Sequence, residues 1–372
     1  MQEWIGATIF KNGEQDRLYD PAHFKSLQHD IELVEFEWPD KNFFPMVYPP
    51  FYYAALQPLA SLSYPNAMRV WAVMSAIAFS LTGFLLFKFY QPSRQLLGTW
   101  LVASLFFVPL LTCFNMGQKA TFLLLILTAT FVLLHHKRPF VAGAVFGLIV
   151  FKPHLGIVIG LAMLAKGQWR FATGAGVVVG AIVGSSYLMH LHLWSEYLNV
   201  VRGMTDYVQS GGYLLEDSHS LWGACQLSLS SWLPANVIKI VVGILSIGIC
   251  VTLWNILRGK IATDSSRFAR QFAVLVLCTI LLSPHFYTYD LTIMLLPMIL
   301  IGASFSDDWR TDKTQKTIAL LLVGFFVFAS MFGKVAVAIR FQPSILFLVG
   351  TIVLVGMWLQ ESYGIQKRQP PV

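Results

Sequence analysis

Negative charge is almost absent from a long part of this sequence. No aspartate or glutamate occurs between Lys41 and Ser195, and charged residues make up only 12% of the 372 positions. Hydrophobic residues make up 56%, and the mean hydropathy is +0.63. This composition excludes an ordinary water-soluble domain. It predicts an all-α polytopic membrane protein with about eleven membrane segments, several of them short or broken.

Several signatures of well-known chemistry are also missing. The sequence has no P-loop, no GxGxxG fingerprint after a strand, no HExxH and no GxSxG, so nucleotide hydrolysis and zinc chemistry have no support. The four cysteines are scattered without a CxxC pair, and we expect no metal site, no required disulfide and no cofactor. The opening stretch MQEWIGATIFKNGEQ lacks the basic region and the long apolar core of a cleavable signal peptide.

The positive charges that are present indicate a topology. The net charge of +7 resides in short connections between apolar runs, which is typical of membrane topology and not of nucleic-acid binding. Basic residues are enriched in cytoplasmic connections, and the 44-residue stretch 191–234 holds only Arg202, so we expect that stretch outside the cytoplasm. The expected membrane segments are 67–88, 96–113, 119–134, 139–151, 155–165, 171–190, 235–257, 271–282, 291–303, 317–333 and 343–359.

This topology divides the chain into five regions. Residues 1–66 are polar and acidic, and we expect an extracytoplasmic or interfacial segment, in which Asp20 caps a helix that begins at Pro21. Membrane helices are expected over 67–190 and 235–359. The extracytoplasmic loop 191–234 separates them, and residues 360–372 form a cytoplasmic tail.

Two pairs of expected segments, 139–165 and 271–303, are too short for ordinary crossings. Lys152-Pro153-His154 interrupts the first pair, and proline breaks a helix because it lacks the backbone donor. Apolar segments of ten to fourteen residues are typical of re-entrant or discontinuous helices. Basic residues at both ends favour two helices that go out and return, with Lys152 at the outer turn, over one kinked span with a snorkelling lysine. The second pair turns at 283–290.

The residues at these turns are the first candidates for chemistry. Lys152 and His154 suit an anion such as a phosphate, because a cation and donors stabilise it in a low-dielectric site. Asp290 is the only carboxylate within the expected membrane segments and short outer turns, and intramembrane ionisable groups are functional candidates. Asp290 is either an acid, a base or a cation partner, or else a helix cap. His285 either binds an anionic phosphate or shuttles a proton, or lies at the interface without such a role.

A short outer turn, CysPheAsnMetGlyGlnLys, precedes residue 120. The amides of Asn115 and Gln118 either bind a sugar hydroxyl or close the turn, and Gly117 favours the turn. Aromatic residues of the loop 191–234 either stack on sugar rings or anchor the loop at the interface, which is the commoner explanation.

Three stretches carry a family resemblance. VYPPFYYAALQPLASLSYPNAMRVW (47–71), the run from NMGQK to KGQWR (115–170) and LLSPHFYTYDLTIMLLP (281–297) resemble the bacterial polyprenol-phosphate-dependent glycosyltransferases of the GT-C superfamily. Within that superfamily they are most similar to the alpha-1,2-mannosyltransferases of lipid glycan assembly. The loop SerHisSerLeuTrpGly (218–223) also looks similar.

The resemblance implies an inverting membrane glycosyltransferase in the bacterial inner (plasma) membrane, with an extracytoplasmic active site. Its donor would be a polyprenyl-phosphate sugar, and its acceptor a lipid-linked or envelope glycan. No nucleotide sugar would be used directly, and no metal is clearly needed. The residues that match the motifs, and are therefore expected in the site, are Tyr48, Asn115, Gln118, Lys152, His154, Tyr289 and Asp290.

One departure from the family pattern concerns the catalytic carboxylate. The family's Asp, in an AspPhe pair, would fall just upstream of Met1, a few residues before the aromatic that matches Trp4. We therefore expect a further helix before residue 1. The alternatives are that Glu3 or another acid substitutes, or that the protein is an inactive scaffold of envelope assembly. A secondary transporter or lipid flippase also suits broken helices, although the sequence shows no convincing internal repeat.

Overall fold

The computed structural model describes residues 2–35, 37, 46–90, 102–207, 214–258, 262–263, 265–306 and 308–368. These residues form helices and connections, and the only β-type pairing among them is an isolated bridge between Ser218 and Tyr287. The chain divides into two compact units, which are described separately. The first unit comprises 1–76, 150–152 and 176–213, and the second comprises 77–149, 153–175 and 214–372.

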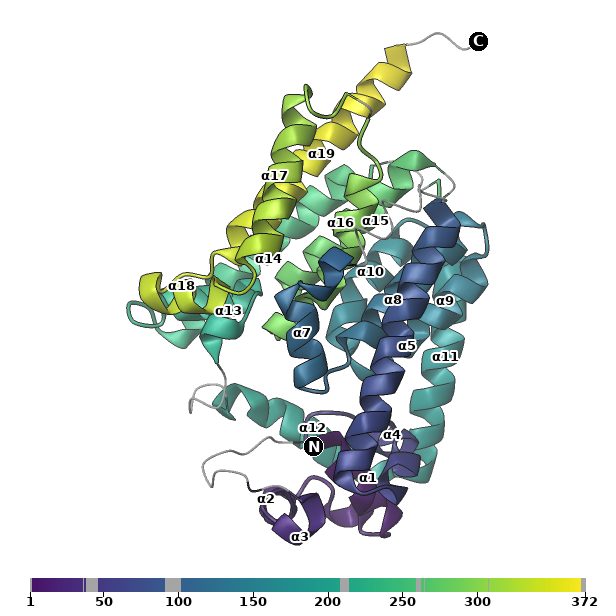
Figure 1. The fold of residues 1–372 in the computed structure, drawn as a ribbon, viewed down its shortest axis with the longest axis vertical. Helices are drawn as coiled ribbons and strands as arrows, with labels where there is room; N and C mark the ends of the chain where they lie inside the picture. Colours follow the sequence, from purple (N-terminus) through teal and green to yellow (C-terminus); the bar gives the residue numbers. More distant parts are fainter. Residues whose placement is uncertain are drawn as a thin grey trace. The chain divides into compact units, whose positions relative to one another are not determined.

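The first unit is built from short helices around an aromatic core. Buried aromatic side chains dominate this core, among them Trp4, Phe10, Phe24 and Tyr53. In Figure 1 its N-terminal helices are drawn in purple. It also contains the start of α5 (Tyr64–Tyr90) and the end of α11 (Trp169–Met189). Its other elements are α1 (Gln2–Lys11), η1 (Gln15–Arg17), α2 (Pro21–Gln28), α3 (Ile31–Val34), α4 (Pro50–Ala55), η2 (Gln57–Ser61) and α12 (Leu191–Tyr207).

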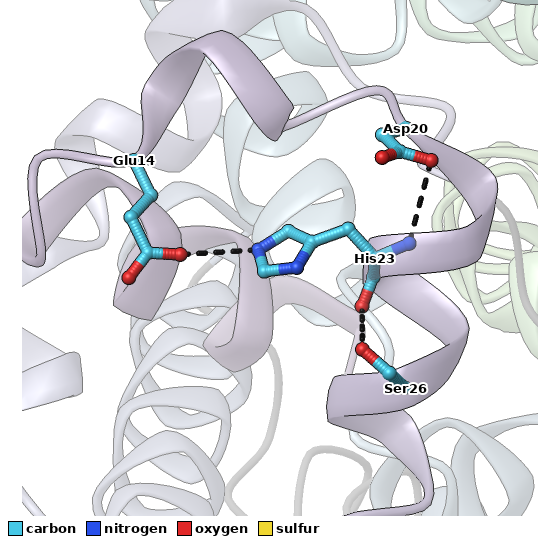
Figure 2. Close-up of polar contacts among 4 residues, drawn as sticks. All are labelled: Glu14, Asp20, His23 and Ser26. Carbon is cyan, nitrogen blue, oxygen red and sulfur yellow. Dashed lines mark hydrogen bonds and ion pairs between the residues drawn. The ribbon is translucent and has the colours of Figure 1, made fainter.

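The start of α2 confirms the predicted cap. The Asp20 carboxylate accepts the backbone N–H groups of Ala22 and His23, at 2.9 and 3.3 Å, and Pro21 occupies the first helical position. Figure 2 shows the imidazole of His23 directed at Glu14, with 3.2 Å between Nε2 and the carboxylate. The Ser26 hydroxyl donates to the His23 carbonyl at 2.7 Å. The connection before α2 is therefore fixed by local polar contacts.

Helix α1 is attached to η2 through main-chain acceptors. The indole N–H of Trp4 lies 3.2 Å from the carbonyl oxygens of both Leu59 and Leu62, and the Lys11 ammonium donates to the Ala60 carbonyl at 3.0 Å. Gly6 faces the buried ring of Tyr53, which a β-carbon at position 6 would overlap. These contacts fix the first turn of α1, which carries Glu3.

The second unit surrounds one helix that is apolar on every side. Residues 272–278 of α15 (Ser266–Leu282) are almost all inaccessible to solvent, as expected for a helix at the centre of a bundle. Helices α8, α10, α14, α16 and α19 pack against it. The other elements are α7 (Val108–Asn115), α8 (Ala120–His135), α9 (Pro139–Gly147), the start of η3 (Leu148–Phe151), α10 (Pro153–Ala165), η5 (Leu215–Asp217), α13 (Leu221–Leu229), α14 (Ala235–Ile256), η6 (Thr288–Met294), α16 (Leu295–Gly302), α17 (Lys313–Phe328), α18 (Phe332–Ile339) and α19 (Ser344–Arg368).

The stretch 139–165 folds as two helices, as the two-helix interpretation predicts. The helical run ends at Phe151, and α10 begins at Pro153. A β-carbon on Gly160 would lie 3.7 Å from the Phe146 ring, although a straight helix would separate these positions by about 21 Å. The chain therefore reverses between them, and Lys152 lies at the reversal.

The structure supports a polytopic membrane protein but not a count of eleven crossings. Among the described residues, four helices are long and apolar enough to span a membrane: α5, α11, α14 and residues 344–361 of α19. The pair α17 and α18 would count as a fifth, but the two helices meet at 89°, and Figure 1 shows α17 beside α19 with α18 turned away. Apolar helices such as α8, α9–η3 and α10 have only 10–17 residues.

Other differences from the expected segments are local. Helix α18 was not predicted from the sequence, and α12 and α13 replace much of the expected loop 191–234 with helix. Helix α19 continues through most of the expected tail, as far as Arg368. Residues 96–101 of the expected segment 96–113 lie outside the described residues.

Two glycines make α9 and α11 cross at backbone contact. A β-carbon on Gly143 would overlap the Phe171 carbonyl, and one on Gly174 would overlap the Phe140 carbonyl. Neither obstacle is a flexible side chain, so substitution must separate the helices.

We therefore expect Gly174→Ala to destabilise the protein by about 1–3 kcal/mol, the usual cost of overpacking. Gly180→Ala, six residues further along α11 and facing open space, is the matched control and should be neutral. Detergent unfolding curves of the two variants test this. Equal midpoints would show that the crossing is not tight.

Candidate active site

A buried lysine marks the reversal between α9 and α10. Lys152 is only 6% exposed and belongs to the first unit. The preceding residue, Phe151, stacks on Tyr52 with ring centroids 5.9 Å apart and planes 28° apart. A buried ammonium is costly unless polar or anionic groups surround it.

Tyr52 belongs to a group of four tyrosines, Tyr19, Tyr48, Tyr52 and Tyr53, here called the tyrosine cluster. The Tyr48 and Tyr52 rings lie 4.6 Å apart, and those of Tyr52 and Tyr53 lie 5.8 Å apart. The Tyr19 hydroxyl donates to the Tyr48 carbonyl at 2.7 Å, and the Tyr48 N–H donates to the Tyr53 oxygen at 3.3 Å. The cluster forms where Pro49 and Pro50 start α4, because proline is well suited to the first turn of a helix.

Glu3 supplies the carboxylate nearby. Burial, and then the negative charge of Glu3, raise the pKa of Tyr52 well above the ordinary value of a phenol. The same carboxylate helps to raise the pKa of Tyr53, after larger contributions from burial and from Tyr19. The phenols therefore stay protonated at physiological pH and can donate hydrogen bonds. The first unit thus contains a half-buried carboxylate, neutral phenol donors and a buried ammonium.

A second polar region lies in the second unit, at the turn 283–290 between α15 and η6. His219 attaches this turn to the loop before α13. Its backbone N–H donates to the Phe286 carbonyl at 2.8 Å, and its ring nitrogens lie 3.0 Å from the Thr288 hydroxyl and 2.8 Å from the Ser344 hydroxyl. Three segments that are distant in sequence therefore meet at one imidazole.

The protonation of this network follows from its partners. The Thr288 hydroxyl hydrogen-bonds to Asp217. Burial and then the charge of Glu216 raise the pKa of Asp217, while the hydrogen bond from Thr288 lowers it by less. A hydroxyl that donates to a carboxylate accepts from the imidazole, so Nε2 of His219 carries the proton and Nδ1 accepts from Ser344. Burial lowers the pKa of His219 to about 3, which keeps the ring neutral.

The turn 283–290 also carries three candidates from the sequence. Asp290 is 2% exposed, and its carboxylate accepts the Tyr287 backbone N–H at 3.5 Å, from within η6. This contact is a helix-capping hydrogen bond made by Asp290. Tyr289 and Tyr287 lie with ring centroids 5.6 Å apart. His285 meets His154 edge to face, at 6.5 Å between ring centroids.

The turn after α7 has the geometry that Gly117 predicts. Gly117 is left-handed, with φ +61°, and the N–H groups of Gly117 and Gln118 bond back to Phe114 and Cys113 in a Schellman motif. Asn115 is exposed at the end of α7. The side-chain oxygen of Gln118 is buried and has no hydrogen-bond partner among the described residues, which leaves an acceptor position for a ligand donor.

The structure divides the candidates between the two units. Glu3, Tyr48 and Lys152 belong to the first unit, and the second holds Asn115, Gln118, His154, His285, Tyr289 and Asp290. The sequence alone did not single out His219, although the loop 218–223 resembles the family. It also did not single out Lys119, which is 1% exposed and precedes α8. The sequence feature that could have identified Lys119 is its position directly before a long apolar run.

Comparison with known proteins identifies the family. The sequence model of glycosyltransferase family 87, a family of GT-C type mannosyltransferases, matches residues 46–284, which is more than half of the chain. The match includes Tyr48, Asn115, Gln118, Lys152 and His154, and ends before His285. No curated protein and no solved structure matches the chain. With its long apolar helices, the chain is a multi-pass membrane glycosyltransferase and belongs to glycosyltransferase family 87.

Proposed function

We propose that this enzyme transfers a sugar from a polyprenyl monophosphate to a lipid-linked or envelope glycan, with inversion, on the extracytoplasmic side of a bacterial inner membrane. The observation that carries the proposal is the buried ammonium of Lys152 at a helix reversal, in the same unit as Glu3 and the tyrosine cluster. A phosphate leaving group needs a cation, and an acceptor hydroxyl needs a base. The first unit contains a group of each kind.

In this mechanism an acceptor oxygen attacks the anomeric carbon while the bond from that carbon to the phosphate oxygen breaks. The leaving group is a polyprenyl phosphate, which gains negative charge in the transition state. Lys152 offsets that charge, and the protonated Tyr52 is suited to donate to the same phosphate. Tyr48 of the same unit is a candidate for binding a sugar. In the second unit, His154 and His285 are candidates for a phosphate, and Asn115, Gln118 and Tyr289 for sugars.

Glu3 is assigned as the base that takes the acceptor proton, since its charge acts on Tyr52 and Tyr53 of the tyrosine cluster. Glu3→Gln keeps the size of the side chain and should lower kcat by about 10²-fold, with little change in KM for the donor. Asp290→Asn is the comparison, because the contact of Asp290 with Tyr287 suits a cap. If only Asp290→Asn abolishes turnover, the base is Asp290.

The donor class is tested with membranes that contain the protein and a radiolabelled polyprenyl monophosphate hexose or pentose. We expect label in a glycan or glycolipid product. A nucleotide sugar should give no product once polyprenyl-phosphate sugar synthesis is blocked. Transfer from the nucleotide sugar under that block would overturn the proposed donor. Absence of transfer from every donor would favour the inactive scaffold.

A further inference from the structure

Arg270 is a buried cation that the proposed reaction does not use. It lies in the first part of α15 and is only 8% exposed. The guanidinium carbon sits 4.0 Å from the centre of the Trp358 ring, so the flat face of the group rests on an aromatic surface. This stacking occupies a face and leaves the N–H groups at the edge for other partners.

One N–H group of this guanidinium lacks an acceptor. Its Nε is buried and has no hydrogen-bond partner among the described residues. A buried charged donor without an acceptor is costly, and cation–π contact with Trp358 does not replace the missing hydrogen bond. Guanidinium edges bind phosphate and carboxylate oxygens through two parallel N–H groups. The position therefore has the chemistry of an anion site.

A second positive charge lies close to Arg270 on the same helix. Arg267 lies one turn earlier on α15, where side chains three residues apart are neighbours. Both residues are near the N-terminus of a 17-residue helix, where the peptide dipoles add partial positive charge. The N-cap residue Ser265 makes no side-chain cap, and its hydroxyl donates to the Ala262 carbonyl instead. An anion would thus be favoured by two guanidinium groups and a helix terminus.

A row of aromatic rings leads from Arg270 to Arg310. Trp358 contacts Phe305 with ring centroids 5.9 Å apart, Phe305 stacks on Trp309 at 5.7 Å, and Arg310 lies 5.6 Å from the Trp309 ring centre. Three rings therefore stand between two arginines. Tryptophan and arginine in such alternation are typical of the level where lipid head groups meet acyl chains.

We propose that Arg270, with Arg267 and the N-terminus of α15, binds the phosphate group of an anionic phospholipid. The site is separate from the turn 283–290, because twelve residues of α15 between Arg270 and Leu282 span about 18 Å. The proposal does not depend on the proposed function. A lipid phosphodiester and free inorganic phosphate share the recognised chemistry, and the aromatic neighbours favour the lipid.

The test measures the unfolding temperature of the full-length protein in detergent with three probes: short-chain phosphatidylglycerol, short-chain phosphatidylcholine and inorganic phosphate. At saturating phosphatidylglycerol we expect the wild type to gain about 3–5 °C, as binding to the folded state requires. Arg270→Gln should lose most of this gain. Arg258→Gln, an exposed arginine just after α14, is the matched control and should retain it.

Each outcome decides the proposal. An equal gain with inorganic phosphate would identify a free-phosphate site and overturn the lipid assignment. An equal gain with phosphatidylcholine would overturn the preference for an anionic lipid. No gain in the wild type, or an undiminished gain in Arg270→Gln, would overturn the site itself. If Arg270→Gln does not fold, Arg270→Lys keeps the charge but not the paired N–H edge. It should raise the phosphatidylglycerol concentration at half-maximal gain about 10-fold.

Discussion

Replacement of Lys152 by alanine should lower the rate of sugar transfer by about 10³-fold. The ammonium is proposed to stabilise charge that develops on the leaving phosphate, and one such electrostatic contact contributes about 10²–10³ in rate. The effect should be at the upper end of this range, because Lys152 is 6% exposed and water cannot easily replace it. The loss should fall on kcat more than on KM, since the charge is greatest in the transition state.

The measurement is transfer from a radiolabelled polyprenyl-phosphate sugar, with each variant normalised to its amount in the membrane. Lys152→Arg keeps the charge and should retain a measurable part of the activity. Lys88→Ala removes an exposed lysine at the end of α5 and serves as the matched control. Undiminished transfer by Lys152→Ala would remove Lys152 from the mechanism.

Acidification should destabilise the protein through His219. Burial lowers the pKa of this imidazole from 6.5 to about 3, so the folded state holds it neutral, whereas the unfolded chain binds a proton below about pH 6.5. Because the unfolded state binds more protons in this range, the contribution is complete above pH 6.5 and is lost as the pH falls toward 3. The loss is about 1.4 kcal/mol per pH unit, or about 2 kcal/mol between pH 6.5 and 5.

The control for this prediction is His219→Gln, whose amide can donate to Thr288 but does not titrate. Between pH 7 and 5, the unfolding free energy in mixed micelles should fall for both proteins. We expect the fall to be about 2 kcal/mol smaller for His219→Gln than for the wild type. His136→Gln, at an exposed position after α8, should keep the wild-type slope. Parallel slopes for the wild type and His219→Gln would show that His219 is not buried as a neutral ring.

Local sequence rules predicted much of the helical framework. Apolar runs gave the approximate positions of α5, α8, α11 and α14, and proline chemistry predicted the break at Lys152 and the cap at Asp20. The bend between α17 and α18 was not predicted, because one apolar run continues across it without proline or a charge before Lys334.

The network around His219 could not be derived from spacing. His219 and Ser344 are 125 residues apart, so their contact depends on tertiary packing that no local pattern encodes. The same is true of Trp4, whose acceptors lie 55 and 58 residues away. The residue types at Lys152, Asn115 and Gln118 could be selected from motifs. Whether each side chain is buried or exposed required the folded chain.

The way α1 is held has an evolutionary consequence. Trp4 and Lys11 donate hydrogen bonds to three carbonyl groups of the segment 59–62. These bonds do not depend on the side chains of the segment, since every residue supplies a carbonyl, whereas Leu59 and Ala60 are restricted by packing. An insertion or deletion there would move all three acceptors at once. Among related sequences, the length of this segment should therefore be kept.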